Sequence, residues 1–123
     1  MDVLIVEDEG PLAQLWADHM SRAGANVTLA YTQSDAEEIL RVCDFPVVVL
    51  NLRLSAGDAS AIADYASFRR PRTKVVFVTS SSFFSDGSIF HYMPNACAMV
   101  PDTTPPADLA ALVEYHGRES VPA

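Results

Sequence analysis

The chain has 123 residues, half of them hydrophobic, and its 8 Lys and Arg against 16 Asp and Glu give a formal net charge of −8. This length fits a single domain, so we expect no separate DNA-binding or catalytic module within these residues. The negative charge repels nucleic-acid phosphates and anionic lipid headgroups, so we expect neither nucleic acid nor a membrane surface as a partner. No apolar run is long enough to span a membrane, and the N-terminus lacks the regions of a signal peptide, so we expect a cytoplasmic protein.

Short apolar runs rich in β-branched residues recur along the chain and predict five strands. These runs lie at residues 3–6, 27–30, 47–50, 75–78 and 98–100. Several are apolar at every position, which is typical of strands that are covered on both faces in a parallel sheet.

The segments between these runs favour helices. From Leu12 to Ala23 apolar residues recur at spacings of three and four, with Pro11 suited to the first turn and Gly24 to the stop. Ser34 begins a capping-box pattern that predicts the start of a second helix. Three more helices are predicted, at 59–66, within 85–92, where Gly and Ser lower the propensity, and from 104–106 onward.

Five strands alternating with five helices predict an α/β fold. We expect a (βα)5 arrangement, a doubly wound five-stranded parallel sheet in the order 2-1-3-4-5. The domain should cover residues 1–118, and residues 119–123 should form a loose C-terminal tail. Cys43 and Cys97 each lie in an apolar stretch, and we expect both to be buried free thiols.

Ligands of such sheets bind beyond the carboxyl ends of the strands, near the point where the strand order reverses. Glu7 and Asp8 follow the first predicted strand, and Asn51 follows the third. Two acids and an amide present hard oxygen ligands of the kind that Mg²⁺ prefers. Acids just ahead of a helix are also stabilised by the helix dipole without any metal.

Three motifs together resemble the receiver domains of bacterial response regulators. They are Val-Glu-Asp-Glu after the first strand, Val-Val-Val-Leu-Asn-Leu-Arg-Leu at the third and Val-Phe-Val-Thr-Ser at the fourth. The resemblance covers residues 2–116. It implies phosphoryl transfer from a histidine kinase to an aspartate at the end of strand three, beside Mg²⁺ held by an acidic pair. It also implies a hydroxyl and a lysine that grip the phosphoryl group, and an aromatic residue on strand five that reports the change.

Only part of the family's site is present. Glu7 and Asp8 match the acidic pair, and Thr79 matches the hydroxyl. Asn51 stands at the phosphoacceptor position, where an amide oxygen is a far weaker nucleophile than a carboxylate. The resemblance then leaves at most a weak Mg²⁺ site of Glu7, Asp8 and Asn51, or no cofactor at all.

The lysine and the aromatic residue are also replaced. Asp102 stands at the lysine position, or Val100 if the following proline is aligned, and Met99 stands at the aromatic position. Lys74 is the only lysine of the chain, and it lies at the start of strand four, at the opposite end from the site. A negative charge at Asp102 would oppose a bound phosphoryl group by about 4 kcal/mol at ~4 Å.

The resemblance thus implies a stand-alone receiver-like protein of a two-component phosphorelay that is not phosphorylated on the usual aspartate. We expect it to act by contact with a histidine kinase, a phosphotransfer protein or another regulator. The expected output face surrounds the weak fourth helix and includes Phe83, Phe84, Phe90, Tyr92 and Met99. An exposed aromatic patch there would mark a partner site.

Two alternatives stay open. The chain is a conventional phosphoacceptor whose aspartate was replaced at Asn51, or it is a small nucleotide- or flavin-binding protein of flavodoxin-like fold. The acids at 7–9 oppose the second, because they repel phosphate. No trio of nucleophile, base and orienting residue is evident, so we expect no catalytic residues and no enzyme activity. The cations between Arg69 and Lys74 are interpreted as a solvated loop, with docking to an acidic partner as the alternative.

Overall fold

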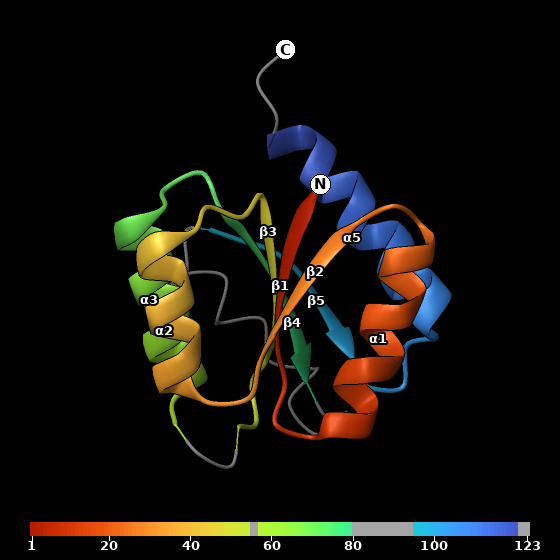
Figure 1. Ribbon diagram of the computed structural model, residues 1–123, viewed down its shortest axis with the longest axis horizontal. Helices are drawn as coiled ribbons and strands as arrows, with labels where there is room; N and C mark the ends of the chain where they lie inside the picture. The colour runs from red at the N-terminus through yellow and green to blue at the C-terminus, as the bar shows by residue number, and fades with distance from the viewer. Residues whose placement is uncertain (55–56, 80–94, 121–123) are drawn as a thin grey trace.

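Five parallel strands form one sheet in the order β2-β1-β3-β4-β5, as predicted. The computed structural model describes residues 1–54, 57–79 and 95–120. The strands are β1 (Asp2–Val6), β2 (Asn26–Ala30), β3 (Val47–Asn51), β4 (Lys74–Thr79) and β5 (Ala96–Pro101). The described helices are α1 (Gly10–Arg22), α2 (Gln33–Val42), α3 (Ala59–Arg69) and α5 (Pro106–Ser120). Figure 1 shows α2 and α3 on one face of the sheet and α1 and α5 on the other.

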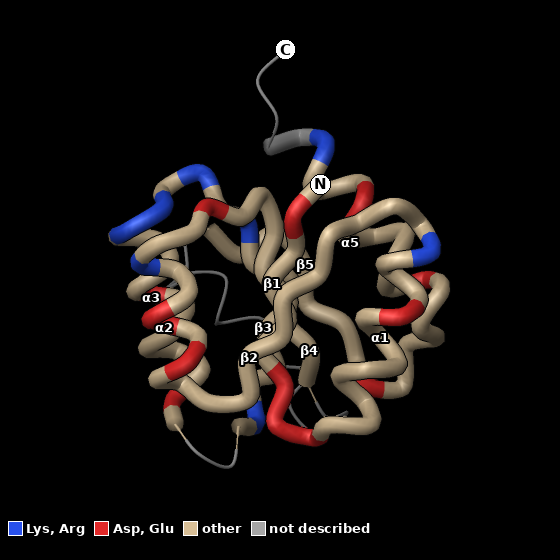
Figure 2. Tube along the Cα trace, in the orientation of Figure 1, with Lys and Arg blue, Asp and Glu red and all other residues tan. Residues whose placement is uncertain are grey.

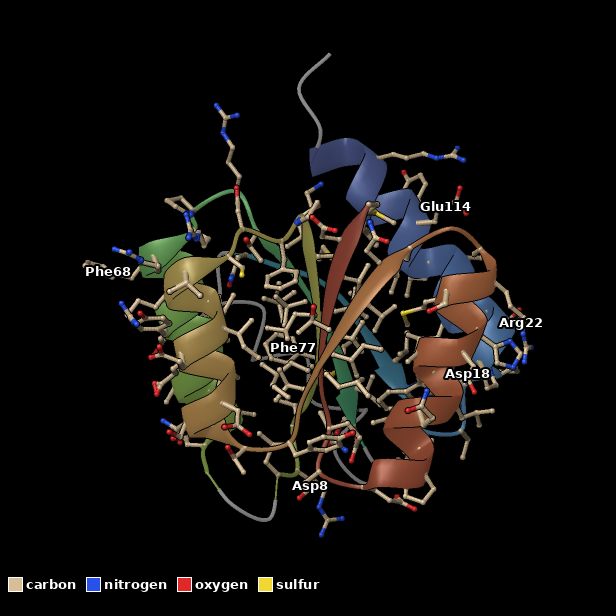
Figure 3. All side chains as sticks on the ribbon, in the orientation of Figure 1. Asp8, Asp18, Arg22, Phe68, Phe77 and Glu114 are labelled. Atoms are coloured by element: carbon tan, nitrogen blue, oxygen red, sulfur yellow. The ribbon has the colours of Figure 1, made fainter. Side chains whose placement is uncertain are left out.

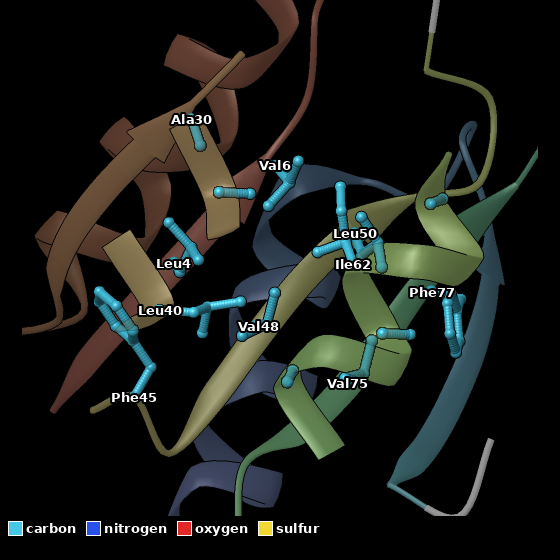
Figure 4. Close-up of a cluster of buried hydrophobic side chains, with 14 residues drawn as sticks. Leu4, Val6, Ala30, Leu40, Phe45, Val48, Leu50, Ile62, Val75 and Phe77 are labelled. Carbon is cyan, nitrogen blue, oxygen red and sulfur yellow. The ribbon is translucent and has the colours of Figure 1, made fainter. Parts of the chain in front are cut away.

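The hydrophobic core lies in two layers because successive strand residues point to opposite faces. Leu4, Val48 and Phe77 face α2 and α3, where they pack with Leu40 and Ile62 (Figure 4). The alternate residues of the same strands face α1 and α5 and pack with the large helix side chains Trp16, Met20, Leu109 and Val113. The central strands are therefore covered on both faces, which explains their continuous apolar runs.

Helix boundaries follow local capping. Pro11 lies in the first turn of α1, and Gly24 adopts a φ of 100° just after its end, as expected. The predicted cap at Ser34 is wrong. The capping residue is Thr32, two residues earlier, so α2 begins at Gln33, and the hydroxyl of Thr32 accepts a hydrogen bond from the amide of Asp35 at 3.1 Å. The same spacing of hydroxyl residue and acid occurs twice in this segment, and Glu37 accepts instead from the Gln33 side chain at 3.2 Å.

Two other predictions need correction. Cys43 is exposed, because it is the capping residue at the carboxyl end of α2 and lies outside the core, and Cys97 is only partly buried. α5 continues to Ser120, so residues 119 and 120 belong to this helix rather than to a loose tail. The predicted fourth helix lies outside the described residues. None of the described helices combines the length and the apolar character that crossing a membrane requires.

Candidate functional site

The carboxyl edge of the sheet brings the ends of β1 and β3 together. Val6 pairs with Leu50 across these two parallel strands, so the next residues, Glu7 and Asn51, emerge side by side. The amide of Glu7 donates to the carbonyl of Ala30 at 3.1 Å, which extends the ladder by one residue and fixes the Glu7 backbone. Asp8 follows at the tip of this edge (Figure 3).

The side chains of Glu7 and Asn51 are joined by a hydrogen bond, and each also accepts one from a backbone amide; we call these two residues the Glu7–Asn51 pair. One carboxylate oxygen of Glu7 accepts from the side-chain amide of Asn51, and the other accepts from the backbone amide of Glu9 at 3.0 Å. The side-chain oxygen of Asn51 accepts from the backbone amide of Arg53 at 2.8 Å. Asn51 thus uses its donor toward an acid and its acceptor toward the backbone, which a carboxylate at this position could not do.

Glu7 is an unusual buried acid. Its side chain is 1% exposed, and burial raises its pKa above the ordinary value. The hydrogen bonds from Glu9 and Asn51 oppose this rise because they stabilise the charged form, whereas neighbouring Asp8 raises the pKa further. The ionised form of Glu7 therefore depends on its two hydrogen-bond donors.

Thr79 and Asp102 lie at the same edge, on the neighbouring strands. Thr79 ends β4, is fully buried and pairs with Pro101, the last residue of β5. The backbone amide of Asp102 donates to the carbonyl of Thr79 at 2.8 Å, while Asp102 itself is exposed to solvent. All five residues expected at the strand ends, Glu7, Asp8, Asn51, Thr79 and Asp102, therefore reach one edge, where the side chain of Glu7 contacts those of Asn51 and Asp8.

The expected output face is described only in part. Met99 lies on β5, is half-buried, and packs against the core layer below α2 and α3. The other residues of this prediction, Phe83, Phe84, Phe90 and Tyr92, lie outside the described residues.

The oxygens that could face a divalent metal at this edge already take part in hydrogen bonds. Both carboxylate oxygens of Glu7 and the side-chain oxygen of Asn51 already accept hydrogen bonds from the protein. Within residues 1–54, 57–79 and 95–120, no group of three or more His, Cys, Asp or Glu residues could hold a metal ion. The weak Mg²⁺ site of Glu7, Asp8 and Asn51 stays a prediction.

Contacts that the sequence pattern does not predict hold the loop that follows β3. Gln33, at the start of α2, accepts a hydrogen bond from the amide of Asp58 at 2.8 Å, and Asp58 in turn accepts from the amide of Ser60 at 2.9 Å to begin α3. Gly57 lies against Gln33 with a φ of 126°, a conformation that favours glycine. The Gly-Asp sequence ahead of α3 was the available signal, but nothing marked Gln33 as its partner.

Comparison with solved structures shows that receiver domains share this fold over nearly the whole chain. A CheY-like response regulator receiver domain protein from Methanospirillum hungatei JF-1 matches with a TM-score of 0.86 and 20% identity, covering 97% of this chain and 94% of that one. The non-phosphorylated HemR receiver domain from Leptospira biflexa matches with a TM-score of 0.86 and 22% identity, over 99% and 98%. The receiver domain of NtrX from Brucella abortus matches with a TM-score of 0.85 and 21% identity, over 98% and 100%.

Sequence comparisons add nothing to this likeness. No protein-family model matches the chain, and no curated protein matches its sequence. At these identities the structural likeness establishes the fold, so the function must be argued from the site.

Proposed function

We propose that this chain is a receiver-like signalling domain that acts through protein contacts and is not phosphorylated at residue 51. The observation that carries the proposal is the Glu7–Asn51 pair at the edge where the family places its phosphoacceptor and acidic pair. Asn51 offers an amide in place of a nucleophilic carboxylate. Its donor and acceptor are both engaged, so its side chain has a fixed orientation.

Charge at this edge also opposes a phosphoryl group. Asp102 is exposed beside Thr79, at the position where the resemblance implies a lysine. Lys74 is the sole lysine and begins β4 at the amino edge, so it is separated from Thr79 by the length of the strand. Without a lysine beside Thr79, a doubly charged group at this edge would lack the cation that the resemblance implies. We infer that the domain signals through its unmodified folded surface, which a kinase, a phosphotransfer protein or another regulator recognises.

The covalent part of the proposal is tested with acetyl phosphate and Mg²⁺. The protein is incubated with both, and its intact mass is measured beside a receiver domain known to accept phosphate, which checks the reagent. We expect no phosphoryl adduct on this chain. A stoichiometric adduct that hydroxylamine removes would be an acyl phosphate and would overturn the proposal.

The interaction part is tested with the partner classes named above. Histidine kinases and phosphotransfer proteins from the source cell are titrated with the unphosphorylated protein and with a variant that carries Phe84→Glu. We expect saturable binding to at least one of them without any phosphoryl donor, and weaker binding by the variant. Binding that appears only after phosphorylation of the chain would contradict recognition of the unmodified domain.

A further inference from the structure

The amino edge of the sheet, opposite the candidate site, carries a surface of different chemistry. α2 and α3 end there side by side, before the chain enters β3 and β4 (Figure 1). Segments 38–44 and 64–74 contain five of the eight cations of the chain but only three of its sixteen acids. Figure 2 shows the basic residues gathered at the ends of these two helices and in the loop before β4, away from the acidic turn after β1. We call this region the α2/α3 basic end.

Arginines of α3 join the two helices at this end. Arg69 donates to the carbonyl of Arg41 at 3.0 Å, and Arg70 donates to the carbonyls of Leu40 and Arg41 at 3.2 and 3.4 Å. These carbonyls belong to the last turn of α2, where helices attract cations. The interpretation of this run as a solvated loop therefore holds only in part, because Arg69 ends α3 and both arginines bind the end of α2, while Arg69 remains exposed to solvent.

These contacts hold the guanidinium groups in place and leave some of their N–H donors available. A guanidinium has several N–H donors, and the described hydrogen bonds use one from Arg69 and two from Arg70. Arg72, in the loop that follows, is exposed. Ordered arginines lose less conformational entropy when they bind a carboxylate than free ones do.

Apolar side chains project into water beside these arginines. Phe68, next to Arg69, is 83% exposed, and Val42, next to Arg41, is 60% exposed. α3 faces the core with Ala59, Ile62, Ala63 and Ala66, so Phe68 lies off the buried stripe and points away from the sheet (Figure 3). A largely exposed phenyl ring beside arginines offers apolar area and guanidinium groups, and arginine and aromatic side chains contribute much of the binding energy of protein interfaces.

We propose that the α2/α3 basic end is a docking surface for an acidic segment of a partner protein that presents one aliphatic or aromatic side chain. The acids would face Arg69, Arg70 and Arg72, and the apolar side chain would cover Phe68 and Val42. Charge complementarity selects this occupant, because the basic end stands out on a chain whose net charge is −8. The proposal goes beyond the proposed function, since it concerns the opposite edge of the sheet and requires nothing of Asn51.

The test uses a fluorescein-labelled synthetic peptide of Glu and Asp with a single central Leu, titrated by fluorescence anisotropy. We expect saturable binding that weakens about fivefold or more with Phe68→Ser and with Arg72→Glu. Matched substitutions on α1, Leu15→Ser at a side chain that is 44% exposed and Arg22→Glu, should leave the affinity unchanged. Binding should also weaken in about 0.5 M salt, where the screening length falls to a few ångströms.

Several results would overturn the proposal. They are absence of saturable binding, equal effects of the α1 and α3 substitutions, and equal affinity for a peptide whose Leu is replaced by Ser, which would indicate charge alone. Sedimentation velocity of the protein alone tests for a further result that would overturn the proposal. A dimer that Phe68→Ser abolishes would make a second copy of this chain the occupant instead of an acidic partner. Because Phe68 and Arg72 are exposed, both variants should fold, and circular dichroism verifies this.

Discussion

Replacing Asn51 by Asp should destabilise the fold through Glu7. The substitution removes the donor to the buried Glu7 carboxylate and places a second carboxylate against it. Two unit charges about 4 Å apart repel by about 4 kcal/mol at an effective dielectric constant of 20. Uptake of a proton by Glu7, whose pKa burial already raises, relieves part of this repulsion. We expect Asn51→Asp to lower the free energy of unfolding by about 2–4 kcal/mol near neutral pH.

A compensating substitution separates this mechanism from general damage. Glu7→Gln alone should lower the free energy of unfolding by about 1–3 kcal/mol, because the NH2 group of the new side chain would face one of the two donors that Glu7 accepts from. In the double variant, the amide of Gln at position 7 can donate to Asp at position 51, and its oxygen can accept from Glu9. Every donor then faces an acceptor again. The double variant should therefore be more stable than the sum of the single losses predicts, with a coupling of about 2 kcal/mol.

Urea unfolding followed by tryptophan fluorescence measures these differences. Trp16 is the only tryptophan of the chain and is 1% exposed, so its emission should report the loss of the core. Asn26→Asp, at the exposed start of β2, controls for the added charge and should change stability by less than about 0.5 kcal/mol. If the two losses simply add in the double variant, or if Asn51→Asp behaves like the control, the argument from the Glu7–Asn51 pair is refuted.

Three further predictions concern the fold and its pH dependence. Gly57→Ala should lower the free energy of unfolding by about 1–3 kcal/mol in the same assay, because φ is 126° and a Cβ would lie 2.5 Å from that of Gln33; no loss would contradict this backbone conformation. Thr32→Ala should cost about 1 kcal/mol in thermal unfolding whereas Ser34→Ala costs little, and the reverse order would restore the cap predicted from the sequence. Because the pKa of Glu7 is raised in the folded state, its contribution to stability should decline as pH rises above 4.5. In urea titrations, the free energy of unfolding of the wild type relative to Glu7→Gln should therefore fall over that range. A relative stability that rises with pH would contradict the direction of the pKa shift.

The sheet could be predicted because its strands carry a strong signal. Runs such as Val47–Leu50 are apolar at every position, and only a strand covered on both faces fits such a run at this length. The strand order then followed from right-handed crossovers, and the order fixed the edge where Glu7 and Asn51 meet. Long-range position was thus predictable without any knowledge of contacts.

Side-chain partners could not be predicted in the same way. The pattern of residues does not say that the Asn51 amide donates to Glu7, or that Gln33 braces Gly57 and Asp58 from another element. The arginines after α3 were expected to be solvated because charge runs usually are, yet two of them cap α2 across the helix pair. Such contacts depend on where side chains of distant elements lie to within a few tenths of an ångström, and hydrophobic periodicity does not encode these positions.

The neighbours of Asn51 fit an amide better than a carboxylate. The backbone amide of Arg53 would satisfy an oxygen of either residue, but the buried Glu7 carboxylate needs a donor, and only the amide supplies one. A carboxylate at position 51 would lie against Glu7 without the lysine that the resemblance implies, because the sole lysine of the chain lies at the amino end of β4, and Asp102 adds negative charge at the carboxyl edge. Asn51 therefore agrees with its surroundings in both hydrogen bonding and charge. This agreement supports the proposal that residue 51 is not phosphorylated over the alternative of a single replacement in an otherwise conventional site.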